Sequence, residues 1–536
     1  MSNFKLTYAT MFSPPDEVHI KYETALSKVK QNLGQEYGLF INGQEIFTEE
    51  KFNDYSPINT DWQLAILQKG NASHANLAVE SARKAFPVWS HTPWQERVQL
   101  LRKVVEIIED RLFELSAALT LEVGKNRMES LGDVQETADL ISYACDQMEI
   151  NQGYQFEMGK DPLTGYEISN VSFLKPYGTW LIISPFNFPF ALTGGPVGAA
   201  LVTGNTVIIK PSSDTAWIVR LLVDCFRDAG LPDGVVNFVT GAGSTLGQSL
   251  ISCNVDGVTF TGSYNVGAAI FREFTNCNWI RPILLELGGK NAVIVSKNAD
   301  LDQAAVGIVR SAFGLQGQKC SAASRVFIDS GVYDDLKTRL KILSGNLKIG
   351  DPSKKSVYLG PVINQGAYEE FMQYIHEIRS AGGDILTGGN VLTGGLFDKG
   401  WYCQPTLVDT LPLSHRLWNH EMFLPITTLA PVDDISEAIQ LANDVNYGLT
   451  AGFYGRDAEV KYFFDHIEAG VAYANRPQGA TTGAWPGFQP FGGWKASGSS
   501  GKNAGGRYYP CICTNKSKHV FMKFKNVADG RYYHPQ

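Results

Sequence analysis

The stretch PYGTWLIISPFNFPFALTGGPVGAALVTGNTVII, residues 176–209, carries no charged side chain over 34 positions. Its length raises the question of a membrane-spanning helix. Pro185, Pro189 and Pro196 would interrupt such a helix repeatedly, and glycines recur throughout the stretch. The pattern instead predicts a buried strand, a turn, a helix and a second strand, which together begin a β-α-β series.

The same alternation continues along the chain. The apolar runs VVNFV and GVTFTG follow with helical patterns between them, and a second series contains NAVIVS, ASRVFID and ITTLAPV. Such repetition predicts two mostly parallel, doubly wound sheets. Upstream, three-and-four spacing predicts helices over residues 76–89, 96–125 and 130–148. Alternating residues predict extended segments over 166–174 and 508–524.

Composition limits the class of protein. The chain has 536 residues, more than one hydrophobic core usually supports, so at least two compact units are expected. Its 46 basic and 54 acidic residues give a formal charge of −8, which disfavours a nucleic-acid partner. Eight scattered cysteines predict a reducing compartment and no metal site. No apolar targeting core or transit peptide opens the sequence, so a cytoplasmic protein without a membrane association is expected, with the mitochondrial matrix as the alternative in a eukaryote.

FGLQGQKCSAASRV, residues 313–326, places Cys320 on a loop between a predicted helix and a predicted strand. A nucleophilic thiol needs access and a lowered pKa, which Lys319 and backbone N–H groups can supply. Taken alone, the segment favours a packed thiol, because most cysteines are small buried side chains. The interpretation therefore depends on the other motifs.

Four further segments each have a plain structural interpretation and a functional one. LLELGGK offers Glu286 as a strand-end charge or a general base, and SPFNFPF offers Asn187 as a turn residue or an oxyanion donor. VIIKPSSD ends a strand with Lys210, which is a solvated charge or a contact for a ribose or phosphate. FTGS, residues 260–263, suits a pyrophosphate at a helix start. Each segment is weak by itself.

Together and in this order, these segments, EMFLP (residues 421–425) and QPFGGWKASG (residues 489–498) resemble the NAD(P)-dependent aldehyde dehydrogenase superfamily over nearly the whole chain. The resemblance implies an α/β fold with two doubly wound α/β domains and a small β oligomerisation ribbon. It predicts a cofactor-binding domain over residues 1–162, 182–285 and 478–500, and a catalytic domain over 286–477. The ribbon and tail would comprise 163–181 and 501–536, and the assembly would be a homodimer or a higher homo-oligomer.

The resemblance also implies a reaction on a small-molecule aldehyde. Cys320 would attack the carbonyl, the Asn187 amide and the Cys320 N–H would hold the oxyanion, and Glu286 would activate the water that hydrolyses the thioester. The cofactor would be NAD, with NADP left open because Ser213 stands where many NAD-preferring members carry a glutamate. The implied cofactor-binding residues are Ser184, Pro185, Phe186, Lys210, Ser213, Gly262, Ser263, Leu287, Glu421 and Phe423. Leu424 replaces a glycine of the family pattern.

Within the superfamily, the segments LEVGKNRMES, ANDVNYGLT and ANRPQGATTGAWPG are similar to the subgroup that oxidises L-glutamate γ-semialdehyde to L-glutamate in proline catabolism. There a loop offers backbone N–H groups to the substrate α-carboxylate, beside a hydroxyl and a cation. The implied substrate-binding residues are Phe188, Lys319, Ser321, Gly479, Ala480 and Phe491.

Three alternatives stay open. Another carboxylated or aliphatic aldehyde, such as succinate semialdehyde, would use the same chemistry. A cysteine hydrolase or acyltransferase would turn over without a nicotinamide cofactor, but none of the nine histidines adjoins a recognisable partner motif. A structural role without catalysis is disfavoured by the presence of Cys320, Glu286 and Asn187 together.

Overall fold

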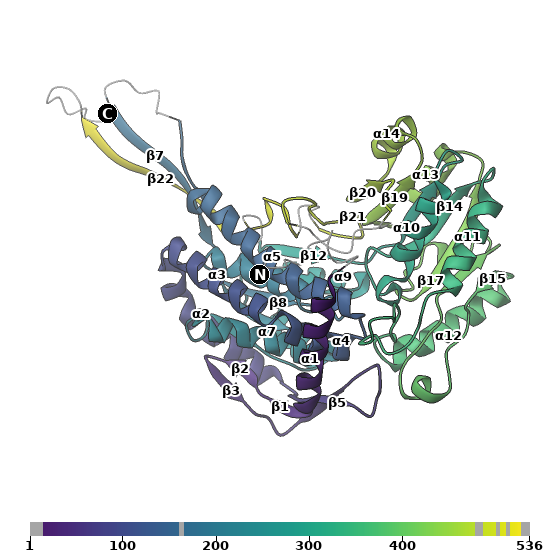
Figure 1. The fold of residues 1–536 in the computed structure, drawn as a ribbon. Helices are drawn as coiled ribbons and strands as arrows, with labels where there is room; N and C mark the ends of the chain where they lie inside the picture. The colour runs from purple at the N-terminus through teal and green to yellow at the C-terminus, as the bar shows by residue number, and fades with distance from the viewer. Residues whose placement is uncertain (1–13, 160–165, 478–485, 500–503, 511–514, 527–536) are drawn as a thin grey trace.

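The computed structural model describes residues 14–159, 166–477, 486–499, 504–510 and 515–526. They form two α/β units that lie side by side, with an arm that projects from the first of them (Figure 1). Each unit contains a seven-stranded, mostly parallel sheet. The predicted α/β class with two such sheets is therefore confirmed.

The sheet of the first unit has the order β12-β11-β8-β9-β10-β2-β3. Strands β8 to β12 run parallel, and β2 and β3 add an antiparallel edge. The uncharged stretch supplies β8, helix α6 and β9, as predicted. The strands are β2 (Leu39–Ile41), β3 (Gln44–Ile46), β8 (Thr179–Ile183), β9 (Thr206–Lys210), β10 (Val236–Phe238), β11 (Gly257–Thr261) and β12 (Ile283–Glu286).

The helices of this unit lie on both sides of its sheet and pack on one another. They are α2 (Ala72–His91), α3 (Trp94–Asp110), α4 (Leu112–Val123), α5 (Arg127–Ile150), α6 (Ala191–Val202), α7 (Ala216–Asp228), α8 (Gln248–Ser252) and α9 (Tyr264–Thr275). The single helix predicted over residues 96–125 is wrong, because α3 and α4 meet at Arg111. α3 buries one stripe of residues, whereas α4 buries every residue from Leu115 to Val123. A helix that is buried on all sides lies inside the unit, whereas a helix that is buried on one face lies at its surface. The chain therefore ends one helix and begins the other at Arg111.

The second unit has a sheet in the order β15-β16-β17-β14-β13-β19-β20. The runs ASRVFID and ITTLAPV coincide with β14 and β17, as predicted. The strands are β13 (Asn291–Val295), β14 (Ala323–Asp329), β15 (Asp384–Thr387), β16 (Thr406–Asp409), β17 (Ile426–Val432), β19 (Thr450–Tyr454) and β20 (Val471–Ala474). The helices are α10 (Leu301–Phe313), α11 (Tyr333–Gly345), α12 (Gln365–Ser380), α13 (Ile435–Asn443) and α14 (Asp457–His466).

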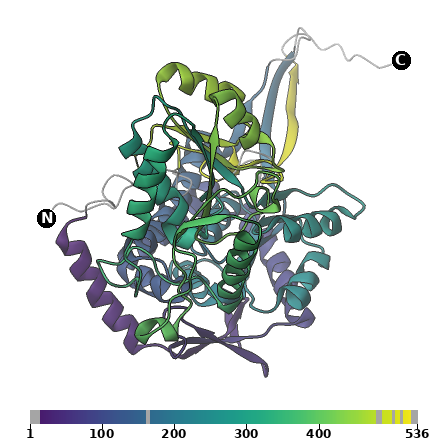
Figure 2. The same cartoon turned by 90° about the vertical axis from the view of Figure 1, so that its right-hand side faces the viewer.

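The arm is a three-stranded antiparallel sheet of β6 (Gln155–Glu157), β7 (Tyr166–Pro176) and β22 (Asn515–Asn526). It projects away from both units in Figure 1 and rises beside them in Figure 2. Of the extended segment predicted over residues 508–524, the strand covers the part from Asn515 onward. The role of this arm in assembly stays a prediction, as do the domain boundaries.

The N-terminal segment connects the two units. Helix α1 (Asp16–Gln31) packs on α4 and is followed by a sheet of β1 (Gln35–Tyr37), β5 (Gln63–Gln68) and β4 (Lys51–Tyr55). The turn between β4 and β5 reaches the second unit, where the Tyr402 hydroxyl donates to the Ile58 carbonyl. A two-stranded sheet of β18 (Tyr447–Gly448) and β21 (Trp494–Lys495) completes the set of strands. Among the described residues, none of the helices has the length and apolarity to cross a membrane.

Two buried carboxyl groups attach this segment to the first unit. Asp54 of β4 lies against Glu122 of α4, and Glu122 accepts hydrogen bonds from the N–H groups of Trp217 and Ile218 at the start of α7, at 2.8 and 2.9 Å. Burial raises the pKa of both carboxyls, that of Glu122 to about 7. The pair therefore retains a proton near neutral pH.

We expect Asp54→Asn to make folding less sensitive to alkaline pH. Because the folded pair has raised pKa values, its contribution to stability is complete below the unfolded pKa of about 4 and is lost as pH rises through about 7. An amide can donate to Glu122 without a titrating proton. The thermal unfolding midpoint should therefore fall by several degrees less in the variant than in the wild type between about pH 6 and pH 9.

The control for this prediction is Asp61→Asn. Asp61 lies in the turn between β4 and β5, and its exposed carboxylate pairs with Lys399 of the second unit. Its pH curve should run parallel to that of the wild type, because an exposed pair contributes little. A curve for Asp54→Asn that is also parallel to the wild type would contradict the assignment of the titrating pair.

Candidate active site

Cys320 lies after a tight loop that joins α10 to β14. Leu315, Gln316 and Gly317 have φ values of 48°, 54° and 69°. A Cβ on Gly317 would lie 2.4 Å from the Leu424 carbonyl oxygen, so the loop needs glycine at this position. Left-handed backbone at two non-glycine residues is strained, and such strain clusters at functional sites. Here the turn brings Cys320 to the wall of a pocket.

This pocket contains about 560 Å³ of empty space, part of it open to solvent, and both units line it. It brings together six of the residues predicted for catalysis and binding, namely Phe188, Glu286, Leu287, Cys320, Ser321 and Phe491. The other lining residues are Glu136, Ala191, Leu192, Thr261, Leu449, Gly492, Gly493, Ser497 and Ala504. The pocket is apolar apart from a few groups that can take part in chemistry, as binding sites commonly are.

The Cys320 thiol is protonated at rest. Burial, followed by the nearby carboxyls of Glu286 and Glu421, raises the pKa of Cys320 to about 12, although N–H groups of the loop oppose this shift. The prediction that Lys319 lowers this pKa is wrong, because its ammonium pairs with Glu129, Nζ to Oε1, at 3.1 Å. The thiol must therefore give its proton to a base before it can act as a nucleophile.

Asn187 lies in the turn between β8 and α6 and is 3% exposed. Its Nδ2 donates to the Gln318 carbonyl at 3.0 Å, two residues before Cys320. Its Oδ1 accepts the N–H of Phe188 at 3.1 Å, which fixes the orientation of the amide. The amide donor is thus held beside the nucleophile loop, as an oxyanion donor needs to be.

Glu286 ends β12 and points into the same pocket, where it is 8% exposed. Burial raises the pKa of its carboxyl to about 7, although its Oε1 accepts the N–H of Ala504 at 3.3 Å. A group that titrates near neutral pH can both take and return a proton. Glu286 therefore has the position and the acidity of a general base.

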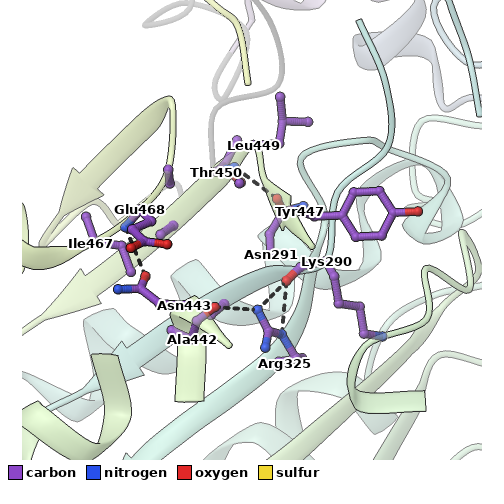
Figure 3. A pocket seen from close by; sticks show the side chains of 14 residues that line it. Lys290, Asn291, Arg325, Ala442, Asn443, Tyr447, Leu449, Thr450, Ile467 and Glu468 are labelled. Carbon is purple, nitrogen blue, oxygen red and sulfur yellow. Dashed lines mark hydrogen bonds between the residues drawn. The ribbon is translucent and has the colours of Figure 1, made fainter. Parts of the chain in front are cut away.

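Residues of the second unit line a smaller cavity (Figure 3). There Asn291 donates to the carbonyl of Cys320 at 2.6 Å and accepts the N–H of Thr450 at 3.0 Å. The Arg325 guanidinium donates to the carbonyls of Lys290 and Ala442. These bonds fix the backbone of Cys320 against the segment that follows Glu286. Nothing in the sequence around Asn291 indicates this role, because its partners lie 29 and 159 positions away.

The remaining predicted substrate residues have different outcomes. Ser321 and Phe491 line the pocket, whereas Lys319 is 5% exposed and does not appear among the lining residues. Gly479 and Ala480 lie outside the residues that the structure describes. Glu136 of α5 adds a carboxyl to the pocket that the sequence analysis missed, because helix periodicity alone does not say which polar residue faces a cavity.

The predicted cofactor residues of the first unit gather at the carboxyl ends of its parallel strands. The strand order reverses between β8 and β11, which is where an open α/β sheet forms its ligand crevice. Gly262 and Ser263 follow β11, and Ser263 caps the twelve-residue helix α9. An anionic group is favoured at such a helix start. Ser184, Pro185 and Phe186 follow β8, Lys210 ends β9, Ser213 begins the turn after it, and Leu287 follows β12. Their role in binding a cofactor stays a prediction.

Glu421 and Phe423 approach this crevice from the second unit. The Glu421 carboxyl accepts the N–H of Gly289 at 2.7 Å, and a Cβ on Gly288 would lie 2.1 Å from Glu421 Oε2. Phe423, with φ of 55°, packs edge-on against the ring of Phe186 at 5.7 Å between centroids. Leu424 stands where the family pattern has a glycine. The left-handed φ is that of Phe423 and not of Leu424, so leucine is tolerated at this position. Within the described ranges, no three His, Cys, Asp or Glu residues form a group that could hold a metal.

Most of the chain is similar in sequence to known proteins. Residues 45–517 match the model of the aldehyde dehydrogenase family. The chain is 37% identical over 491 residues to a 1-pyrroline-5-carboxylate dehydrogenase of Geobacillus thermodenitrificans, which covers 90% of this chain and 93% of that relative. It is also 37% identical over 494 residues to 1-pyrroline-5-carboxylate dehydrogenase 1 of Halalkalibacterium halodurans, covering 91% and 93%.

A solved structure is similar over nearly the full length. The 1-pyrroline-5-carboxylate dehydrogenase from Thermus with bound NAD aligns with a TM-score of 0.90 and 33% identity, covering 97% of this chain and 100% of that one.

Proposed function

The chain belongs to the aldehyde dehydrogenase family, and on that premise we propose that it oxidises L-glutamate γ-semialdehyde to L-glutamate with a nicotinamide cofactor. The observation that carries the proposal is the single pocket that holds Cys320, Glu286 and two phenylalanine rings beside a dinucleotide crevice. The relatives named 1-pyrroline-5-carboxylate dehydrogenase support this substrate, because 1-pyrroline-5-carboxylate opens by hydration to the semialdehyde.

The reaction proceeds in two stages. The Cys320 thiol gives its proton to Glu286, its sulfur bonds to the aldehyde carbon, and the Asn187 amide and the Cys320 N–H hold the oxyanion. A nicotinamide cofactor bound in the crevice would supply the acceptor for the hydride of this carbon. Glu286 then releases the thiol proton to solvent and is again a carboxylate. Water attacks the thioester, Glu286 takes a proton from that water and returns it to the departing sulfur, and the acid product forms. A cysteine suits both stages because thiolates add and leave readily.

Recognition of this substrate needs groups for one carboxylate and one ammonium. Ser321 supplies a hydroxyl from the pocket wall, and Lys319, which does not line the pocket and pairs with Glu129, adds a cation to its surroundings. Glu136, which also lines the pocket, offers a carboxyl to the ammonium. Phe188 and Phe491 contact the aliphatic chain. An aldehyde without these charged groups would lose the polar contacts and keep only the apolar ones.

Steady-state kinetics on a panel of aldehydes tests the proposal. We expect kcat/KM for L-glutamate γ-semialdehyde to exceed that for propanal and for succinate semialdehyde by at least about tenfold, because unpaired polar groups in a site penalise a ligand that lacks their partners. Equal values for the three aldehydes would contradict the substrate, and turnover without a nicotinamide cofactor would instead favour a hydrolase.

The pH dependence of turnover should follow Glu286. Its carboxyl has a pKa of about 7 and acts as a base only when ionised, so the rate of hydrolysis should fall about tenfold per pH unit below that value. Above about pH 8 the carboxyl is ionised and this limb should level off. A profile of kcat from about pH 5.5 to 9 measures it, and a flat profile would contradict the role of Glu286.

NAD is the proposed cofactor, and Ser213 leaves NADP open. Ser213 is exposed after β9, next to Lys210, and carries no charge that would repel a 2′-phosphate. We expect Ser213→Glu to lower kcat/KM for NADP by about tenfold or more through like-charge repulsion, and to change the value for NAD by less than about threefold. The matched control is Ser213→Gln, which adds the same bulk without charge. Equal losses with both cofactors would place Ser213 away from the ribose.

Assembly and location are part of the same proposal. The arm formed by β6, β7 and β22 extends beyond both units and gives an antiparallel edge for pairing with a second copy (Figure 1). We propose a homodimer or a higher homo-oligomer in the cytoplasm. The mass measured by light scattering tests the assembly.

A further inference from the structure

We propose that a buried ion pair, Lys125 with Asp133, is a positioning device for the substrate pocket that holds both the ring of Phe188 and the start of α6 in place. The inference rests on the proposed function, in which Phe188 contacts the aliphatic chain of the substrate. Lys125 and Asp133 do not line the pocket themselves, so they would act through residues that do.

Lys125 contacts both Asp133 and the aromatic ring. It follows Gly124, which ends α4 in a left-handed conformation, and its side chain is fully buried. Its Nζ lies 2.7 Å from Asp133 Oδ2 and 3.8 Å from the centroid of the Phe188 ring. A cation over an aromatic face is attracted by the ring electrons, and the attraction is strongest away from water. The ammonium therefore gives the ring a preferred position that an apolar neighbour would not.

Asp133 extends this hold to the neighbouring helix. Its other oxygen, Oδ1, accepts the N–H of Ala191 at 2.8 Å. Ala191 is the first residue of α6, and Phe190, which precedes it, provides no side-chain cap. The carboxylate of α5 thus caps α6 from outside, where negative charge is favoured. Phe188 and Ala191 both line the pocket, so one ion pair fixes two parts of its wall.

The packing of α5 on α6 makes this arrangement rigid. A Cβ on Gly194 would lie 2.3 Å from Thr137 Cγ2, and one on Gly198 would lie 2.8 Å from Ile141 Cγ1. The glycines therefore allow the two helices to approach closely and leave little room for adjustment. With the helices fixed, the distance from Asp133 to the start of α6 is fixed as well.

Stability alone does not account for a pair of this kind. Removing two charges from water is costly, and apolar residues of the same volume often stabilise a fold as well or better. An apolar pair would not direct the ring or cap α6. The backbone of Phe188 is held separately, because its N–H is bonded to Oδ1 of Asn187, so a change in the position of the ring should affect binding more than catalysis.

The test replaces the pair without leaving a lone buried charge. In Lys125→Met with Asp133→Asn, the amide can still accept the Ala191 N–H, but the cation is gone. We expect KM for L-glutamate γ-semialdehyde to rise about tenfold, with kcat within about threefold and KM for NAD unchanged. Lys125→Arg, which keeps a cation over the ring, should leave KM within about threefold of the wild type. A purely structural pair would instead lower the unfolding midpoint and leave all KM values alone.

A cycle with Phe188→Leu shows whether the effect passes through the ring. In that background the double substitution should raise KM by less than about twofold, because the ring it positions is absent. A full tenfold rise there, or no rise in the wild-type background, would overturn the inference. A second neutral pair, Lys125→Gln with Asp133→Asn, keeps a hydrogen bond between the two side chains and carries the same prediction should the first not fold.

The proposed function is judged separately in the same assays. The wild-type preference for the semialdehyde over propanal tests the substrate. The ratio of variant to wild type, on whichever aldehyde has the highest kcat/KM, tests the ion pair. One result can therefore fail while the other stands.

Discussion

Replacement of Cys320 by alanine should lower kcat for NAD-dependent aldehyde oxidation by at least about 10⁴-fold. The methyl group cannot bond to the aldehyde carbon, so neither the thiohemiacetal nor the thioester forms. The fold should be retained, because the thiol is only partly exposed in a pocket and the backbone of the loop is held by Asn291 and Asn187 through main-chain carbonyls. Formation of reduced cofactor measured by absorbance gives the rate, and the unfolding midpoint checks the fold.

The matched control is Cys253→Ala. Cys253 is also a partly exposed free cysteine, but it follows α8 and its thiol contacts Asn76 on the surface of the first unit. Its replacement should leave kcat within about twofold, since surface substitutions away from special features have small effects. If Cys320→Ala retained a tenth or more of the wild-type rate, another residue would have to be the nucleophile.

Glu286→Gln should lower steady-state turnover by about 10²- to 10⁴-fold, which is the range for loss of a general base. The amide has the size of the carboxyl and can still accept the Ala504 N–H through its oxygen, but it cannot take a proton from water. Thioester hydrolysis has no other base in the proposed mechanism. The thiol, by contrast, can also lose its proton to hydroxide from solvent.

A rapid-mixing experiment separates the two stages. We expect Glu286→Gln to release about one equivalent of reduced cofactor per active site before slow turnover, because hydride transfer precedes hydrolysis. The low-pH limb assigned to Glu286 should also vanish from the profile of kcat. The control is Glu114→Gln, at an exposed carboxylate that pairs with Lys28, with kinetics like those of the wild type. Loss of turnover without any early release would show that no other base replaces Glu286 in taking the thiol proton, so that its loss blocks the first stage as well as the second.

The sequence predicted the sheets well because their signal is local. Runs such as ASRVFID and ITTLAPV are short, β-branched and free of interruption, and the structure places β14 and β17 on them without a shift. Strands buried on both faces need continuous apolar residues whatever lies beside them. The helix predicted over residues 96–125 failed for the opposite reason. Its bend at Arg111 follows from what surrounds α4 on each side, and this information is not local.

In the candidate site, too, local motifs predicted the identity of the residues but not their charge states. Cys320, Glu286, Asn187, Phe188 and Phe491 came from motifs, and they meet in or beside one pocket although up to 304 positions separate them. The charge state of Cys320 did not follow from its neighbours in sequence. Lys319 adjoins it in the chain, yet Glu129 takes that cation, while Glu286 and Glu421 come close from other strands and loops.

By itself, then, the sequence indicated which residues are candidates for the chemistry and which segments become strands, because both depend on residue type and on spacing within a few positions. Tertiary structure alone decided how those residues behave. The pKa of a buried group depends on everything within a few ångströms in three dimensions. For the same reason, the contacts that link Asn291 to the Cys320 carbonyl and Lys125 to the ring of Phe188 exist only once distant segments have packed together.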